Sequence, residues 1–419
     1  MFQNLFAILL ALCSTITGAQ TDRLHQNNTS YLRTVLLQRS DLEMSMPIIK
    51  IGSGDQLVLR FDDLRSGVHD YSYTFEHCNQ DWTTSGLFPL DYLDGFEEQF
   101  ISDYAFSFNT KQSYTQYRAV FPNDQLNFLV SGNYLIHIWE SGNDSAPVLT
   151  LPFYVREELA TIQASVQQPN LTRFRNDYQR LLLEVGIKEV PSSNPFDEVR
   201  VSVIQNFREN QPLTDIKPRL IANNTMLFDQ TDLVFPGGKE FRRFDIRSTR
   251  VQSERIVKMD RTQTGTDAWI KVDQNRSYQR YAFDNDVDGQ FLIDADMARN
   301  KHLDADYVMV HFALESPFWM SQGDYFVVGG FNHYQTGEEN RMEYDADLQQ
   351  YTCQIYLKQG YYNYLYTFLE HGSNIQDYSM AEGNYFETEN NYQVMIYLHD
   401  NMRNADRLIG YSSLTSFPR

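Results

Sequence analysis

Residues 70–82 read Asp70-Tyr-Ser-Tyr-Thr-Phe-Glu-His-Cys-Asn-Gln-Asp-Trp82, and we expect the first domain to be organised around this stretch. Aromatic side chains recur at every second position from 71 to 75, which is typical of a β-strand with one buried face. An apolar run at 57–61 lies before it and closes with the acidic pair Asp62-Asp63. Residues 131–140 can pair back against it. The pattern predicts a central strand of a β-sandwich.

The first 19 residues contain no charged side chain, and an apolar run from Leu5 to Leu12 is followed by small residues at Thr17 and Ala19. This arrangement predicts a secretory signal peptide over residues 1–19. Cys13 follows Leu12 rather than a small residue, so we do not expect a lipoprotein anchor. No later stretch has the 18 or more apolar residues that a spanning helix needs, so we expect an exported chain without membrane insertion.

The chain has 419 residues, a net charge of -20 and a pI near 4.8. This balance argues against nucleic acid as a partner, because nucleic acid selects clustered Lys and Arg. After the predicted signal peptide only Cys78 and Cys353 remain, and they fall in different predicted domains. A disulfide-dense secreted scaffold is therefore excluded, and we expect two buried, unpaired thiols.

Short strand patterns with turn signals about every ten residues continue along the chain, and no long amphipathic helix interrupts them. We expect an all-β fold of tandem immunoglobulin-like or early-set β-sandwiches. The predicted domains are a first β-sandwich at 25–157, a second at 158–300 and a third, early-set-like one at 301–419. Within the first, residues 87–103 form a long connection that carries several carboxylates, and long loops often carry function.

The motif that most resembles a ligand-binding site is Asp284-Asn-Asp-Val-Asp-Gly289, which supplies the first six positions of a calcium-binding EF-hand loop. The loop requires a Glu at its twelfth position, where this chain has Ala295. Asp-Gly is also a strong hairpin signal, here between 280–283 and 290–293. The sequence favours a turn, and Asp284, Asp286 and Asp288 stay candidate calcium ligands.

No HExxH, paired CxxC, GxSxG, Walker A or GxGxxG motif is present. Asp62 and Asp63 are successive strand residues that face opposite sides, so they do not form an acid/base pair. We therefore expect a protein without enzymatic activity and without a cofactor. Tyr362, Tyr364 and Tyr366 share one strand face, which either fills a core or stacks on sugar rings.

Several motifs, in this order and spacing, carry a resemblance to a known family. In the first domain they are Gly54-Asp-Gln-Leu-Val-Leu-Arg-Phe-Asp-Asp-Leu64, Tyr73-Thr-Phe-Glu-His-Cys-Asn-Gln-Asp-Trp82, Ser107-Phe-Asn-Thr110, Phe121-Pro-Asn123 and Ser131-Gly-Asn-Tyr134. Later ones are Asp286-Val-Asp-Gly289, Ala305-Asp-Tyr-Val308 and Gln359-Gly-Tyr-Tyr-Asn-Tyr364. At these positions the chain resembles the plug protein family of the bacterial type IX secretion system. The last region is also similar to an early-set sandwich of the glycogen-binding type, through Val328-Gly-Gly-Phe-Asn332.

The resemblance implies a non-enzymatic periplasmic protein that reversibly seals the outer-membrane translocon barrel of this system. It implies a location at the outer membrane through that partner, and we expect a monomer. We interpret the signature residues as structural: Phe61, Asp62, His77, Cys78, Trp82, Gly132, Asn133 and Tyr134. The candidate contacts to the translocon are the carboxylates of the long connection: Asp91, Asp94, Glu97 and Glu98.

Two other functions stay open at this point. One is a secreted glycan-binding module, although His333 follows Phe331-Asn332 where sugar-binding members of the early-set type usually have a tryptophan. The other is a calcium-stabilised structural or adhesin-like protein, based on the aspartates of residues 284–288.

Overall fold

The computed structural model describes residues 23–143, 145–228 and 233–417, so the expected signal peptide lies outside the described residues. Strands dominate the described chain, and the all-β prediction is confirmed. Within the described residues the helices are one turn long: α3 (Pro89–Tyr92), α4 (Pro195–Glu198), α5 (Lys301–Asp304) and the 3₁₀ turns η1 (Thr172–Phe174) and η2 (Gly330–Asn332). Over the described ranges, no helix has the length and apolar character needed to cross a membrane.

The first sandwich consists of two main sheets and a short hairpin-like pair. One sheet has the order β1 (Gln26–Asn27), β12 (Leu149–Arg156), β11 (Gly132–Glu140), β5 (Tyr71–Cys78), β7 (Gln99–Phe100), with β3 (Ile48–Lys50) parallel to β12. The other has the order β2 (Leu32–Arg39), β4 (Leu57–Asp63), β9 (Thr115–Phe121), β8 (Asp103–Phe106), and β6 (Leu93–Gly95) pairs with β10 (Leu126–Phe128).

Strand β5 holds the position that the sequence predicts. It lies between β11 and β7, and it pairs antiparallel with β11 along its whole length. Its aromatic face, Tyr71, Tyr73 and Phe75, packs in a core shared with β4 and β9 of the opposite sheet. The period-2 alternation of the opening stretch therefore corresponds to the buried face of a sandwich strand.

The second sandwich is assembled from two separate parts of the chain. One sheet has the order β13 (Thr161–Gln167), β14 (Tyr178–Gly186), β18 (Thr225–Phe228), β17 (Pro218–Ala222), with β19 (Val234–Pro236) beside β14. The other has the order β16 (Leu213–Ile216), β15 (Val199–Gln205), β30 (Asn391–Asp400), β31 (Ala405–Thr415). The two sheets enclose one apolar cluster, to which both parts of the chain contribute.

The third sandwich is formed by the chain between these two parts. One of its sheets has β28 (Gly360–Glu370) paired with β20 (Arg242–Asp245), β23 (Phe291–Ile293), β25 (Gly323–Val328) and β29 (Gln376–Asp377). The other has the order β21 (Ile256–Arg261), β22 (Thr266–Ile270), β24 (Tyr307–Glu315), β27 (Gln350–Lys358), β26 (Glu343–Asp345).

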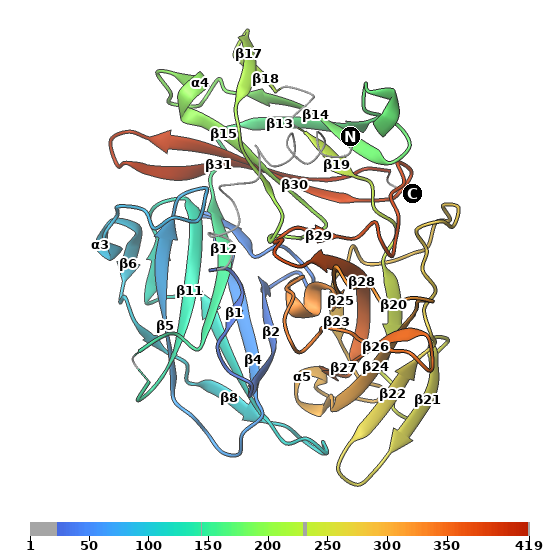
Figure 1. The fold of residues 1–419 in the computed structure, drawn as a ribbon. Helices are drawn as coiled ribbons and strands as arrows, with labels where there is room; N and C mark the ends of the chain where they lie inside the picture. The colour runs from blue at the N-terminus through green and yellow to red at the C-terminus, as the bar shows by residue number, and fades with distance from the viewer. Residues whose placement is uncertain (1–22, 144, 229–232, 418–419) are drawn as a thin grey trace.

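The predicted boundaries at 158–300 and 301–419 differ from this packing. Strands β20 to β23 belong with the third sandwich, whereas β30 and β31 complete the second. The reason is the antiparallel pairing of β15 with β30 over seven residue pairs, which joins segments almost 200 residues apart. The third sandwich is thus an insertion in the second, and Figure 1 shows the second lying across the ends of the other two.

Candidate functional site

Two of the signature residues lie where the first sandwich meets the second. Cys78 and Trp82 belong to an apolar cluster that also contains Met395, Tyr397 and Leu408 of strands β30 and β31. Burial raises the pKa of the Cys78 thiol, and Cys353 is likewise buried, with its pKa raised to about 12. The prediction of two buried, unpaired thiols is confirmed.

Gly132 and Asn133 are placed at the same interface. The Tyr397 hydroxyl donates a hydrogen bond of 2.7 Å to Asn133 Oδ1 across it. Gly132 has φ +150, and a Cβ atom there would lie 2.5 Å from His77 Nε2 and 2.9 Å from the Asp406 carbonyl oxygen of the second sandwich. Only glycine permits this close approach of the two sandwiches.

His77, Tyr134 and Phe61 serve the interior of the first sandwich. The His77 ring stands perpendicular to that of Tyr134 at a centroid distance of 4.9 Å, and burial lowers the pKa of His77. Its Nε2 lies 3.1 Å from the Ser131 carbonyl oxygen. Phe61 packs on Tyr117 within the shared core. These contacts are those of a packed, neutral histidine.

Asp62 forms a buried ion pair with the third sandwich. Its Oδ2 lies 2.6 Å from Lys358 Nζ, and each side chain is 1% exposed. The Tyr307 hydroxyl donates to the same oxygen at 2.7 Å, and Lys358 Nζ also donates to the His302 carbonyl oxygen at 2.7 Å. Burial raises the pKa of Asp62 and lowers that of Lys358, while the attraction between the charges opposes both shifts. Such a pair fixes the relative position of two bodies because neither charge can be left alone in the interior.

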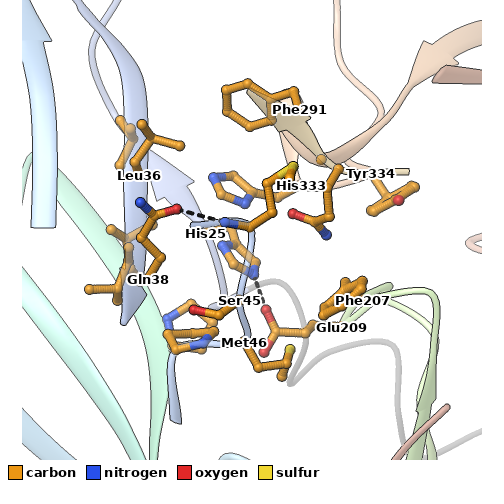
Figure 2. A pocket seen from close by; sticks show the side chains of 18 residues that line it. His25, Leu36, Gln38, Ser45, Met46, Phe207, Glu209, Phe291, His333 and Tyr334 are labelled. Carbon is orange, nitrogen blue, oxygen red and sulfur yellow. Dashed lines mark hydrogen bonds and ion pairs between the residues drawn. The ribbon is translucent and has the colours of Figure 1, made fainter. Parts of the chain in front are cut away.

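All three sandwiches meet around one carboxylate, Glu209. His25 Nε2 of the first sandwich lies 2.6 Å from Glu209 Oε2, and the Tyr154 hydroxyl donates to Glu209 Oε1 at 2.5 Å. The His25 ring stacks on His333 of the third sandwich with centroids 4.0 Å apart (Figure 2). A cavity of about 80 Å³ lies beside them. Burial holds the pKa of His333 well below its usual range.

Sequence reasoning did not find this junction. Glu209 and His25 stand in no motif, and His333 is notable in the sequence only because it stands where a tryptophan is usual in sugar-binding early-set domains. Single polar residues that meet across long sequence distances leave no local pattern, so the sequence does not indicate this junction.

The predicted translocon contacts lie on the surface of the first sandwich. Asp91, Asp94, Glu97 and Glu98 are all exposed, but their segment folds into α3, β6 and β7 rather than a plain loop. Asp91 contributes locally, since its carboxylate accepts a hydrogen bond of 2.8 Å from the Phe88 amide at the start of α3.

Large apolar side chains are exposed in the same segment. Between residues 88 and 100 they are 70% to 78% exposed, and we call this set the aromatic edge: Phe88, Leu90, Phe96 and Phe100. Period-2 reasoning does not reveal them, because it finds residues that share a face and not whether anything covers that face.

The candidate calcium ligands are engaged with the protein itself. Asp284 pairs with Arg243 at 2.5 Å, and Asp286 accepts hydrogen bonds from the amides of Phe241 and Asp288. Burial raises the pKa of Asp286 to about 6 and that of Asp288 to about 7. Residues 280–283 form no strand, so the predicted hairpin lacks its first arm. No group of three metal-ligating side chains is found among the described residues.

The tyrosine row of β28 fills the core of the third sandwich. Tyr362, Tyr364 and Tyr366 are at most 1% exposed, as the core interpretation predicts. The hydroxyls of Tyr364 and Tyr366 both donate to Asp273 Oδ2, at 2.5 and 2.8 Å. This row therefore offers no face on which a sugar ring could stack.

Comparisons with known proteins agree with this architecture. The family model described as type 9 secretion system plug protein 1st domain matches residues 32–157. A crystal structure of a hypothetical protein from Parabacteroides merdae ATCC 43184 superimposes with a TM-score of 0.90 and 31% sequence identity, covering 94% of this chain and 99% of that one. A search among curated proteins gave no match. The chain belongs to the type 9 secretion system plug protein family.

Proposed function

We propose that this protein is a non-enzymatic periplasmic plug that reversibly seals the outer-membrane translocon of the type IX secretion system. Its family supports a role connected with this secretion system and a periplasmic or outer-membrane-associated location. The observation that carries the proposal is that buried polar contacts lock the three sandwiches into one body.

Two interfaces of that body each have an ion pair. The first and third sandwiches share the pair of Asp62 with Lys358. The first and second share a 2.6 Å ion pair of Glu157 with Arg407, both side chains being 18% exposed. Removing one partner of the buried Asp62–Lys358 pair costs about 3–5 kcal/mol, so the first and third sandwiches are held against relative rotation.

A rigid body of this kind suits a steric seal. An aqueous pore that passes folded proteins is too wide to be closed by side-chain movement, and a separate folded domain must cover it. The same body must leave when the translocon is engaged, which requires a specific but reversible interface with an apolar centre and a polar rim. We propose that the plug acts as a monomer.

A permeability measurement tests this function. The gene is deleted in a secreting cell, and the entry of a large antibiotic across the outer membrane is compared with that in the parent strain. We expect increased entry only while the translocon is present, and recovery when the chain is supplied from a plasmid. Unchanged permeability of the deletion strain would overturn the proposal. Retention on a glucan column would instead favour the glycan-binding alternative.

A further inference from the structure

We propose that the aromatic edge and its four carboxylates form the surface that docks onto the translocon, against an apolar patch rimmed by Lys and Arg. This inference rests on the proposed plug function and names the chemistry of its partner. It joins the acidic residues of the sequence-based prediction to the exposed apolar side chains that the structure adds.

The segment occupies a free side of the first sandwich. Strand β7 pairs only with β5, so it is an edge strand of its sheet within the described residues. Helix α3 and strand β6 lie on the side of this sandwich that faces away from the third (Figure 1). The segment is thus accessible while the three-sandwich body stays intact.

The number of exposed apolar side chains is unusual for a free surface. Single exposed apolar residues are common, but a concentration of them marks an interaction site. Phe88, Phe96 and Phe100 are 76%, 70% and 72% exposed, in a stretch of 13 residues. Rigid aromatic rings of this kind provide the central anchors of protein interfaces.

The charge of the segment selects the partner. Residues 88–108 contain carboxylates and no Lys, Arg or His. Asp103 is paired with Arg118 at 2.8 Å, whereas Asp94, Glu97 and Glu98 form no ion pair within the part of the chain that is described. Unpaired carboxylates around an apolar centre are complementary to a patch bordered by Lys and Arg.

A hollow beside the edge adds a place for one basic side chain. It has a volume of about 350 Å³ and is lined by Glu98, Trp139 and Glu140, among others. A guanidinium or ammonium group in this hollow would meet the Glu98 carboxylate, and Trp139 offers it an aromatic face.

The same charges argue against the other occupants of an apolar surface. A second copy of this chain in a two-fold contact would bring like charges together. An anionic lipid surface would repel the carboxylates. A protein with a basic rim is the partner that the charge pattern fits.

The test compares two sets of exposed aromatic residues. One variant carries Phe88→Ser, Phe96→Ser and Phe100→Ser on the edge. The control carries Phe318→Ser and Trp319→Ser on the third sandwich, where the side chains are 73% and 63% exposed. Each tagged full-length protein is used to capture the translocon from detergent-solubilised outer membranes of a deletion strain.

We expect the edge variant to retain at least tenfold less translocon than the wild type, and the control to retain as much. The variant Asp94→Asn/Glu97→Gln/Glu98→Gln should bind more weakly at low salt and show a smaller loss of binding as salt rises. A photo-crosslinking residue at Phe96 should give a translocon adduct, and one at Phe318 should not; this readout does not depend on how the serine variants fold.

The outcomes separate the inference from the plug function. In one outcome, the wild type and the edge variant capture equal amounts of translocon while Phe96 gives no adduct. This result overturns the docking surface but not the plug function. Absence of wild-type capture overturns the plug function as well. Self-association or binding to anionic vesicles that the edge variant specifically loses would also overturn the inference, because the occupant would then be a second copy or a membrane.

Discussion

Replacing Lys358 by Met should weaken the interface between the first and third sandwiches and lower the free energy of unfolding. In the wild type, Lys358 Nζ lies 2.6 Å from Asp62 Oδ2 in a site where both side chains are 1% exposed. Met fills much of the same volume but leaves the Asp62 carboxylate with the Tyr307 hydroxyl, at 2.7 Å, as its close partner. The buried charge then lacks a counter-ion.

The expected loss is about 3–5 kcal/mol of the free energy of unfolding at pH 8, the usual cost of removing one partner of a buried ion pair. The double variant Asp62→Asn/Lys358→Met should recover most of it, since neither charge remains and the Tyr307 hydroxyl can donate to the amide oxygen. The interaction energy from the double-mutant cycle should therefore be large. Substitutions of residues in direct contact change the free energy of unfolding by amounts that do not add.

The loss should depend on pH in one direction. Burial already raises the pKa of Asp62, and Lys358 opposes that shift, so its removal raises the pKa further. A carboxyl whose folded-state pKa lies above the unfolded value of 3.8 contributes stability that is present below that value and is lost as pH rises through the folded value. Lys358→Met should thus be least damaging at pH 4 and most damaging at pH 8.

Urea unfolding of the four proteins of the cycle, followed by tryptophan fluorescence at pH 4, 6 and 8, measures these differences. A cost below about 1 kcal/mol at pH 8, or an equal cost at pH 4 and pH 8, would refute the reasoning. It would mean that the interface readily lets water reach Asp62 and that the sandwiches are not locked by this pair.

The remaining predictions concern the core and the acidic turn. Burial raises the pKa of Asp288 to about 7, so the contribution of this carboxyl to stability is lost as pH rises from about 4 to 7. Asp288→Asn should therefore raise the melting temperature at pH 8 and make the melting temperature less dependent on pH. An unchanged pH dependence would contradict this. Gly132→Ala should cost about 1–3 kcal/mol in urea unfolding because its Cβ would lie 2.5 Å from His77 Nε2, and wild-type stability would show that the interface adapts. Trp82→Ala should cost about 3–5 kcal/mol by opening a cavity between the first and second sandwiches, which a near-neutral urea midpoint would rule out. Adding millimolar calcium or a chelator should leave the melting temperature unchanged, and a calcium-dependent rise would favour the calcium-stabilised alternative.

The strands with clear alternation could be predicted from the sequence because their signal is local. Tyr71, Tyr73 and Phe75 lie on one face in any strand conformation, and the structure buries that face. The tyrosine row of β28 obeys the same rule. The family could also be predicted from the sequence, because the order and spacing of the motifs do not depend on how the chain packs.

The domain division could not be predicted in the same way. The end of the chain pairs with β15 across the whole inserted sandwich, and alternation does not specify which strand lies beside which. The contacts that the signature residues make between sandwiches could not be predicted for the same reason. Asp62 is 296 residues from Lys358, and Asn133 is 264 residues from Tyr397, so neither contact has a local signature.

The sequence by itself determined the all-β class, the central strand at 71–78 and the family. The tertiary structure decided that Cys78, Trp82 and Asp62 join sandwiches, and that the phenylalanines of the aromatic edge stay exposed. The physical reason is that a residue's own neighbours set its direction along a strand, whereas its burial and its partner are set by whichever distant segment packs against that face.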